Sequence, residues 1–252
     1  MEKENLNYLK ENIKDNNFLN NNKQNVITEE DSVLDKSHII SLLQDCKKIR
    51  PYKLLTDNSN CVSCISAKYN YQENKCSNLL TGSFDSTINY YDISKMNVSS
   101  SFKHHNNGVW TINCSYFNNN FASGGSDKEI YLWDLKSAKP FETLKHHNNT
   151  IYNLKYSKVN SNFLLSCSRG IIALWDLRYT NQPLVDLNNR EDNFVYSSNL
   201  IINDKYIVYG LIDGSINIAR ANDGKEVCSY KYEFGPYKSY LNIDVNNSVS
   251  II

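Results

Sequence analysis

Short apolar runs with the length and composition of β-strands recur along most of this chain, and Asn, Asp, Ser and Gly stand between them. Three of these runs close on an aromatic residue followed by Asp, namely Tyr91-Asp92, Trp133-Asp134 and Trp175-Asp176. Apolar runs bounded by turn residues predict strands rather than helices. The pattern therefore predicts an all-β region.

The three aromatic-Asp pairs are evenly spaced. Asp92, Asp134 and Asp176 follow one another at intervals of 42 residues. Self-similarity at about 40 to 45 residues, with Trp-Asp near the end of each unit, is typical of a β-propeller built from four-stranded blades. Propellers are mostly rigid platforms, so this prediction gives an architecture and does not identify a partner.

Composition divides the chain into three parts. Residues 1–30 are rich in Asn, Lys and Glu and poor in β-branched apolar residues, which favours disorder. Residues 31–51 contain apolar positions at helical spacing and end at Pro51, which predicts a short amphipathic helix and a linker. We expect this helix to pack on the propeller; the alternative is that it docks a partner. Residues 52–252 carry the predicted propeller repeats.

Charge and composition narrow the classes of function. Lys plus Arg and Asp plus Glu number 27 each, so the formal net charge is zero and nucleic acid is not an expected partner. No apolar run reaches the roughly 18 residues of a membrane span, and the first residues lack the features of a signal peptide. Seven cysteines without a framework spacing suit reduced thiols. We therefore expect a cytoplasmic or nuclear protein that does not bind a membrane.

Alignment of the units adds a set of polar residues in the second one. His105 lies four residues before Val109, while Ser123 and Asp127 lie ten and six residues before Trp133. Here the chain resembles the WD40-repeat family, in which a His, a Ser or Thr, an Asp and a Trp form a hydrogen-bonded tetrad. The resemblance implies such a tetrad of His105, Ser123, Asp127 and Trp133, which would satisfy buried polar groups and lock the blade.

The other units match the family pattern unevenly. The first unit has Asn58 to Asn60 where the His belongs, and the third has Arg169 where the Asp belongs, so its tetrad must be broken or rebuilt. The fourth unit keeps Asp213 but lacks an aromatic residue at the end of its third strand. A fifth unit starts at residues 226–232, so about four and a half blades are visible.

This blade count leaves closure of the ring open, because a closed propeller usually needs four to eight blades, and seven blades of about 42 residues would need roughly 300 residues, more than the 252 of this chain. Residues 52–55 are candidates for an outer strand that pairs with the last blade. We consider a small five-blade ring, an incomplete chain, and closure by a second molecule, and we favour the incomplete chain.

Candidate catalytic and metal-binding groups are sparse. The histidine pairs at 104–105 and 146–147 are of a type that binds metals or acts as a general base, but the tetrad positions account for His105 and His147. Cys61 and Cys64 have no second Cys or His pair that would complete a zinc site. No nucleophile, phosphate-loop or zinc-protease motif is present. The sequence predicts a protein that is not an enzyme and has no cofactor or metal.

Binding has better candidates than catalysis. In the WD40 family the loops that carry the tetrad His and Asp lie on the top face, where partners usually dock. The resemblance implies that the residues beside those loops are exposed together. These residues are Phe84, Trp110, Ser126, Lys128, Tyr152, Arg169 and Ile212. Aromatic residues and Arg dominate interface energies; the alternative is that Trp110 and Tyr152 fill gaps between blades.

Arg178 indicates a different partner. Trp175-Asp176-Leu177-Arg178 matches the WDxR pattern by which many WD40 substrate receptors contact the adaptor of a cullin-type ubiquitin ligase. A solvated or locally paired Arg178 is the favoured alternative. The sequence as a whole indicates a non-catalytic scaffold that binds a protein or peptide through its top face. Its alternatives are a ubiquitin-ligase substrate receptor and, more remotely, a WD40-type methylesterase of diphthamide synthesis.

Overall fold

The computed structural model describes residues 57–70, 75–93, 95, 97–188 and 194–231. The predicted tail at 1–30, the predicted helix at 31–51 and the candidate outer strand at 52–55 lie outside the described residues, as does the fifth unit beyond residue 231. Where the structure describes the chain, every regular element is a β-strand, and no helix is long and apolar enough to cross a membrane. The predicted all-β fold is confirmed.

The strands in the described residues form four antiparallel sheets of four strands each. The first sheet consists of β1 (Val62–Asn70), β2 (Lys75–Ser83), β3 (Thr87–Asp92) and β4 (Asn97–Lys103). The second consists of β5 (Val109–Cys114), β6 (Asn120–Gly125), β7 (Glu129–Asp134) and β8 (Glu142–Lys145). The third consists of β9 (Ile151–Tyr156), β10 (Phe163–Ser168), β11 (Ile171–Asp176) and β12 (Val185–Asn188). The fourth consists of β13 (Val195–Ile201), β14 (Tyr206–Leu211), β15 (Ser215–Arg220) and β16 (Glu226–Lys231).

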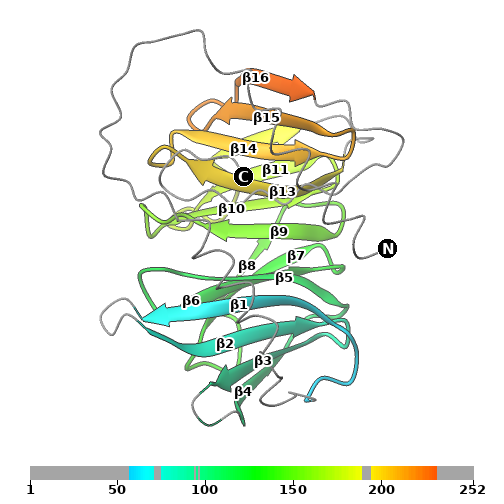
Figure 1. Ribbon diagram of the computed structural model, residues 1–252, viewed down its shortest axis with the longest axis vertical. Coiled ribbons are helices and arrows are strands. Elements are labelled where there is room, and N and C mark those ends of the chain that lie inside the picture. Colours follow the sequence, from blue (N-terminus) through cyan, green and yellow to red (C-terminus); the bar gives the residue numbers. More distant parts are fainter. Residues whose placement is uncertain (1–56, 71–74, 94, 96, 189–193, 232–252) are drawn as a thin grey trace, which may run out of the picture. The chain divides into compact units, whose positions relative to one another are not determined.

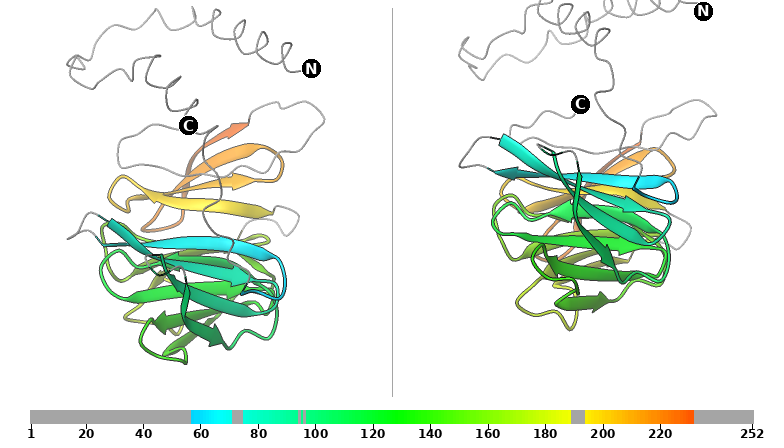
Figure 2. Two further views of the ribbon diagram at one scale, coloured as in Figure 1. Left: turned by 60° about the horizontal axis from the view of Figure 1, so that its bottom comes forward. Right: turned by 90° about the horizontal axis from the view of Figure 1, so that it is seen from below.

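Each sheet is one blade, in which the strands follow one another in chain order from inner to outer (Figures 1 and 2). The inner strands β1, β5, β9 and β13 lie next to one another in that order. We call the end at which these inner strands begin the top, and the end at which they finish the bottom. Residues 226–231, which the sequence assigned to the start of a fifth unit, form the outer strand of the fourth blade, because β16 pairs with β15.

The core lies between consecutive blades rather than within any one of them. One cluster joins Phe102 of the first blade to Trp133 of the second, and another joins Leu132 to Trp175 of the third. A third cluster packs Leu174 of the third blade on the apolar face of the fourth. The third strands β7 and β11 are buried on both faces, which explains why they read as continuous apolar runs ending in Trp-Asp.

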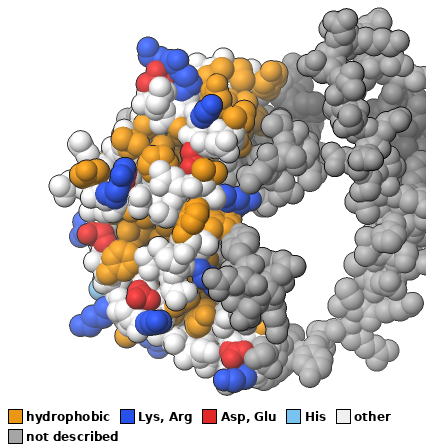
Figure 3. Space-filling model, turned by 90° about the vertical axis from the view of Figure 1, so that its left-hand side faces the viewer, with side chains coloured by type: hydrophobic (Ala, Val, Ile, Leu, Met, Phe, Trp, Pro, Cys, Tyr) orange, Lys and Arg blue, Asp and Glu red, His pale blue; other side chains and the backbone are white. Residues whose placement is uncertain are grey.

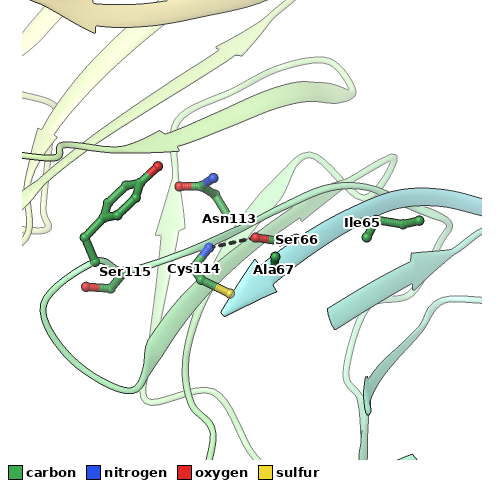
Figure 4. Close-up of a pocket in the computed structure, with 7 residues that line it drawn as sticks. Ile65, Ser66, Ala67, Asn113, Cys114 and Ser115 are labelled. Atoms are coloured by element: carbon green, nitrogen blue, oxygen red, sulfur yellow. Dashed lines mark hydrogen bonds between the residues drawn. The ribbon is translucent and has the colours of Figure 1, made fainter. Parts of the chain in front are cut away.

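Polar side chains also tie the inner strands together. The Cys114 N–H donates to Ser66 Oγ at 3.2 Å, and in the equivalent place of the next pair of blades the Tyr156 N–H donates to Asn113 Oδ1 at 2.8 Å. Figure 4 shows the first of these bonds beside a cavity of about 220 Å³ between β1 and β5. Backbone groups that have no partner within their own sheet are thereby satisfied, and blade order is fixed.

Candidate functional site

In the second blade, the four residues of the tetrad that the family resemblance implies lie within hydrogen-bonding distance of one another. His105 Nδ1 lies 2.8 Å from Asp127 Oδ2, and His105 Nε2 lies 2.7 Å from Ser123 Oγ. The Trp133 indole N–H donates to the same Ser123 oxygen at 2.8 Å. All four side chains are buried or nearly so. The tetrad joins the loop before β5, strand β6, the β6–β7 turn and strand β7.

The carboxylate of this tetrad is held ionised. Burial acts to raise the pKa of Asp127, but the hydrogen bond and charge of His105 and the Asn106 N–H outweigh it, and the net pKa is lowered. An ionised Asp127 accepts a hydrogen bond from the His105 Nδ1–H group, which leaves Nε2 to accept a hydrogen bond from the Ser123 hydroxyl. Ser123 then accepts from Trp133, so each donor has an acceptor.

The third blade rebuilds the tetrad without a carboxylate. His147 Nε2 lies 2.7 Å from Ser166 Oγ, which also accepts the Trp175 indole N–H at 2.9 Å. In the place of the missing Asp, Ser168 Oγ lies 2.9 Å from His147 Nδ1. Burial, together with the neighbouring His146, lowers the pKa of His147 to about 3. The sequence predicts that the tetrad of this blade is either broken or rebuilt, and the structure shows that it is rebuilt from a second serine.

The first blade substitutes an amide for the imidazole. Asn58 Oδ1 accepts from Asn89 at 3.2 Å and from the hydroxyls of Thr81 and Tyr91 at 3.4 Å each. Asp85 is fixed by the Thr87 and Ser59 backbone N–H groups. Burial would raise the pKa of Asp85, but these bonds and the hydroxyls of the same two residues hold it well below its usual range.

The fourth blade has no tetrad among the described residues. Asp213 bonds only locally, accepting the N–H and the hydroxyl of Ser215, and it lies 3.6 Å from Lys231. In the register of β14 and β15, the fully buried Ala219 takes the place of the Trp. The first three blades therefore build three different polar sets at this location, and the fourth has an apolar Ala219 there.

A continuous row of aromatic rings crosses the top of all four described blades. Phe84 of the first blade lies 4.9 Å from Trp110 of the second, measured between ring centroids. Trp110 in turn lies 5.5 Å from Tyr152 of the third, edge to face, and Tyr152 lies 6.5 Å from Phe194 of the fourth. The Arg169 guanidinium lies over the Phe194 ring at 4.4 Å. We call the residues Phe84, Trp110, Tyr152 and Phe194 the aromatic row.

The aromatic row is held in place and still reaches solvent. The Trp110 indole N–H donates to Ser126 Oγ at 2.7 Å, and Phe84 packs against Gly108, where a Cβ atom would stand 2.9 Å from the Phe84 ring. Phe84 and Trp110 nevertheless each keep 38% of their surface exposed. The Trp110 ring thus contacts rings of both neighbouring blades and also remains partly exposed.

The other top-face candidates lie around this row. Lys128 is exposed in the β6–β7 turn with a backbone φ of 71°, and Arg169 is exposed in the β10–β11 turn. Ile212 is half-buried, and its N–H donates to the Phe194 carbonyl at 3.0 Å. The sequence analysis missed Phe194, because the fourth blade lacks the Trp that would mark its register. The position of Phe194 just before the inner strand β13 was the signal that could have identified it.

Arg178 lies on the bottom and is locally paired. Its Nη2 and Nε atoms lie 2.6 and 2.9 Å from the two oxygens of Asp176, and its guanidinium lies 5.8 Å from the Tyr179 ring. These bonds lower the pKa of Asp176 and raise that of Arg178. One edge of the guanidinium is therefore engaged by its own chain.

The remaining titratable groups give no catalytic arrangement in the part of the chain that the structure describes. No group of three His, Cys, Asp or Glu side chains there could hold a metal ion. His146 lies 3.0 Å from Asp186 on the outer strand, and His104 packs edge to face on Tyr131. Burial raises the pKa of the Cys64 thiol to about 11, so it is not an activated nucleophile.

Comparison with protein families agrees with the blade geometry. The family model described as WD domain, G-beta repeat matches residues 96–134 and 138–176. Each match runs from the outer strand of one blade through the third strand of the next. The matched residues are thus WD40 repeats, and the sheets that they build have the form of WD40 blades. A search of curated proteins gave no match. Repeats of this family act in general as protein-interaction scaffolds and are typically non-catalytic.

Proposed function

We propose that this protein is a non-catalytic scaffold that binds a protein or peptide partner through the aromatic row and the residues beside it on the top face. The observation that carries the proposal is the chain of ring contacts from Phe84 to Phe194, which links four blades and leaves two large rings partly exposed. Rigid aromatic side chains provide contact area at low entropic cost. Lys128, Arg169 and Ile212 border the row and supply charge and apolar surface.

Affinity purification with mass spectrometry tests this proposal. The wild type is compared with the double variant Trp110→Ala and Tyr152→Ala, and with the matched variant Tyr230→Ala on the exposed outer strand β16. We expect the double variant to lose the copurifying proteins while keeping a cooperative unfolding transition, and Tyr230→Ala to keep them. Unchanged recovery with a lowered unfolding temperature would assign Trp110 and Tyr152 to packing alone. Cleavage of a diphthamide methyl ester by the purified chain would overturn the non-catalytic part of the proposal.

A second candidate function is that of a ubiquitin-ligase substrate receptor. It rests on the exposed Arg178 at the bottom of the third blade, which bonds Asp176 through Nε and Nη2 and not through Nη1. An Arg in this position is able to make bidentate bonds to a carboxylate that Lys136, its counterpart in the second blade, is unable to copy. Arg178→Glu should abolish capture of a cullin-ligase adaptor, whereas Lys136→Glu should not. If the wild type captures no such adaptor, this function is excluded.

A further inference from the structure

A groove of about 430 Å³ opens at the bottom of the third and fourth blades. Its lining comes from four strand ends that are far apart in the sequence. Phe163 begins β10, Leu184 directly precedes β12, Tyr206 begins β14 and Ala221 directly follows β15. The volume lies within the range of roughly 300 to 1,000 Å³ that is typical of ligand sites.

The walls of this groove are apolar, and one of them stands out in solvent. Leu184 is 54% exposed, although its N–H is fixed to the Leu174 carbonyl at 2.7 Å. Phe163 packs on the cluster between the third and fourth blades, and the Ala221 N–H donates to the Lys205 carbonyl. A single exposed Leu is ordinary, but here it borders a concave apolar surface.

The turn beside the groove is strained and is anchored across the blade boundary. Ile202, Asn203 and Asp204 have φ angles of 51°, 53° and 61°. Asn and Asp adopt this conformation readily in tight hairpin turns, but a β-branched residue such as Ile202 does so only at a cost. The Ser157 hydroxyl of the third blade donates to Asp204 at 2.5 Å and holds the turn. Ile202 itself is exposed and does not line the groove, whereas Asp204 and Lys205 of the same turn do.

The mouth of the groove carries the cations Lys205 and Arg220, and the carboxylates Asp204 and Asp223 lie beside them. Lys205 is exposed, and no described carboxylate pairs with its ammonium group. The Arg220 guanidinium lies 2.7 Å from Asp223 and remains partly exposed. Asp204, the acidic residue of the lining, is bonded to Ser157, and burial raises its pKa. Figure 3 shows this face of the molecule, where apolar side chains gather and charged side chains of both signs lie among them.

We propose that this groove docks an acidic peptide segment of a partner protein. One apolar side chain of the segment enters between Leu184 and Tyr206, and flanking Asp or Glu residues meet Lys205 and Arg220. The apolar floor and the exposed Lys205 ammonium group, which no carboxylate of the described residues pairs with, favour this occupant over a neutral or basic one. The groove lies on the face opposite the aromatic row, so it is a second docking surface and does not depend on the proposed function of the first.

The second blade offers a matched control. Phe141 occupies the place of Leu184: it directly precedes the outer strand, its N–H bonds to Leu132, and it is 55% exposed. It does not line the groove. Phe141→Ser and Leu184→Ser thus remove equally exposed apolar side chains, and only the second changes the proposed site.

The test is selection of a random peptide library displayed on phage against the full chain, followed by affinity measurement of the enriched synthetic peptides. We expect an apolar residue flanked by Asp or Glu, binding that weakens as salt rises, and a loss of about tenfold or more from Leu184→Ser and from Lys205→Glu. Phe141→Ser and the Trp110→Ala, Tyr152→Ala double variant should leave this affinity unchanged.

Several results would overturn the proposal. The first is a selection that enriches no peptide, or one that enriches basic peptides. The second is a Phe141→Ser variant that lowers the peptide affinity as much as Leu184→Ser does, and the third is a Leu184→Ser variant that leaves that affinity unchanged. Flotation with vesicles that contain phosphatidylserine, if lost in Leu184→Ser while no peptide binds, would assign the groove to a membrane surface. Concentration-dependent self-association that Leu184→Ser abolishes would assign it to a second copy of the chain.

Discussion

At the scale of single residues, the second and third blades place the same His-Ser-Trp arrangement in two electrostatic settings. Asp127 gives His105 a carboxylate partner, whereas His147 meets two hydroxyl groups. Without a carboxylate, burial keeps the His147 imidazole neutral and lowers its pKa to about 3. The two blades should therefore respond differently to acid, even though they look alike in sequence.

Acid should destabilise the protein through His147. Its pKa is about 3 in the folded chain and 6.5 in its reference state, so between these values the unfolded chain binds a proton that the folded chain does not. Its contribution to stability is complete above pH 6.5 and is lost as the pH falls towards 3, with a slope of at most about 1.4 kcal/mol per pH unit. Urea unfolding from pH 4 to 7 should show this slope in the wild type and less of it in His147→Gln. Identical slopes would contradict the burial of a neutral imidazole.

The serine at the centre of each tetrad should contribute comparably in both blades. Ser123→Ala and Ser166→Ala each leave a buried indole N–H and an imidazole nitrogen without a partner. We expect each to lower the free energy of unfolding by about 1 to 3 kcal/mol, and exposed Ser137→Ala to change it little. Chemical denaturation provides the measurement. If Ser166→Ala left the free energy of unfolding unchanged while Ser123→Ala lowered it, the rebuilt tetrad would not lock its blade.

The resemblance to the WD40 family located the tetrad of the second blade, because the spacing of its four residues matches the family pattern. Spacing did not identify Ser168, since the β10–β11 turn is one residue shorter and the sequence places Arg169 where an Asp is expected. It also left open what replaces the His in the first blade. Asn58 takes that role because an amide oxygen accepts several donors at once.

At the scale of strands and turns, close backbone approaches decide which residues are possible on the top face. A Cβ atom on Gly125, at the end of β6, would lie 2.5 Å from the Gly108 carbonyl oxygen and 3.3 Å from His105 Nδ1. The first of these neighbours is backbone and is unable to move without disturbing the β5 entry loop. Glycine at 125 thus holds the loop of the tetrad His against the second strand.

Gly125→Ala should therefore destabilise the second blade. We expect a loss of about 1 to 3 kcal/mol in the free energy of unfolding, because the added methyl group forces a backbone shift. Asn107→Ala, an exposed change in the same loop, serves as the control. Urea unfolding of the two variants would contradict this view if Gly125→Ala were as stable as Asn107→Ala.

At the scale of the whole described region, both surfaces are assembled from pieces that the sequence keeps apart. The 42-residue period predicted the blades, and the family resemblance placed Phe84, Trp110 and Tyr152 on one face. Phe194 was missed because the fourth blade has lost the residues that mark its register. The bottom groove was not predictable, because it depends on how Leu184 and Tyr206 of different blades meet across a packed interface.

Site-specific photo-crosslinking tests the top-face scaffold most directly. A photoreactive phenylalanine analogue at position 84 stands on the aromatic row, and the same analogue at position 230 stands on the exposed outer strand β16. We predict that a copurifying protein becomes crosslinked from position 84 and not from position 230, and that Trp110→Ala with Tyr152→Ala removes the crosslink. Recovery of the same protein without any crosslink from position 84 would contradict a partner bound at the aromatic row.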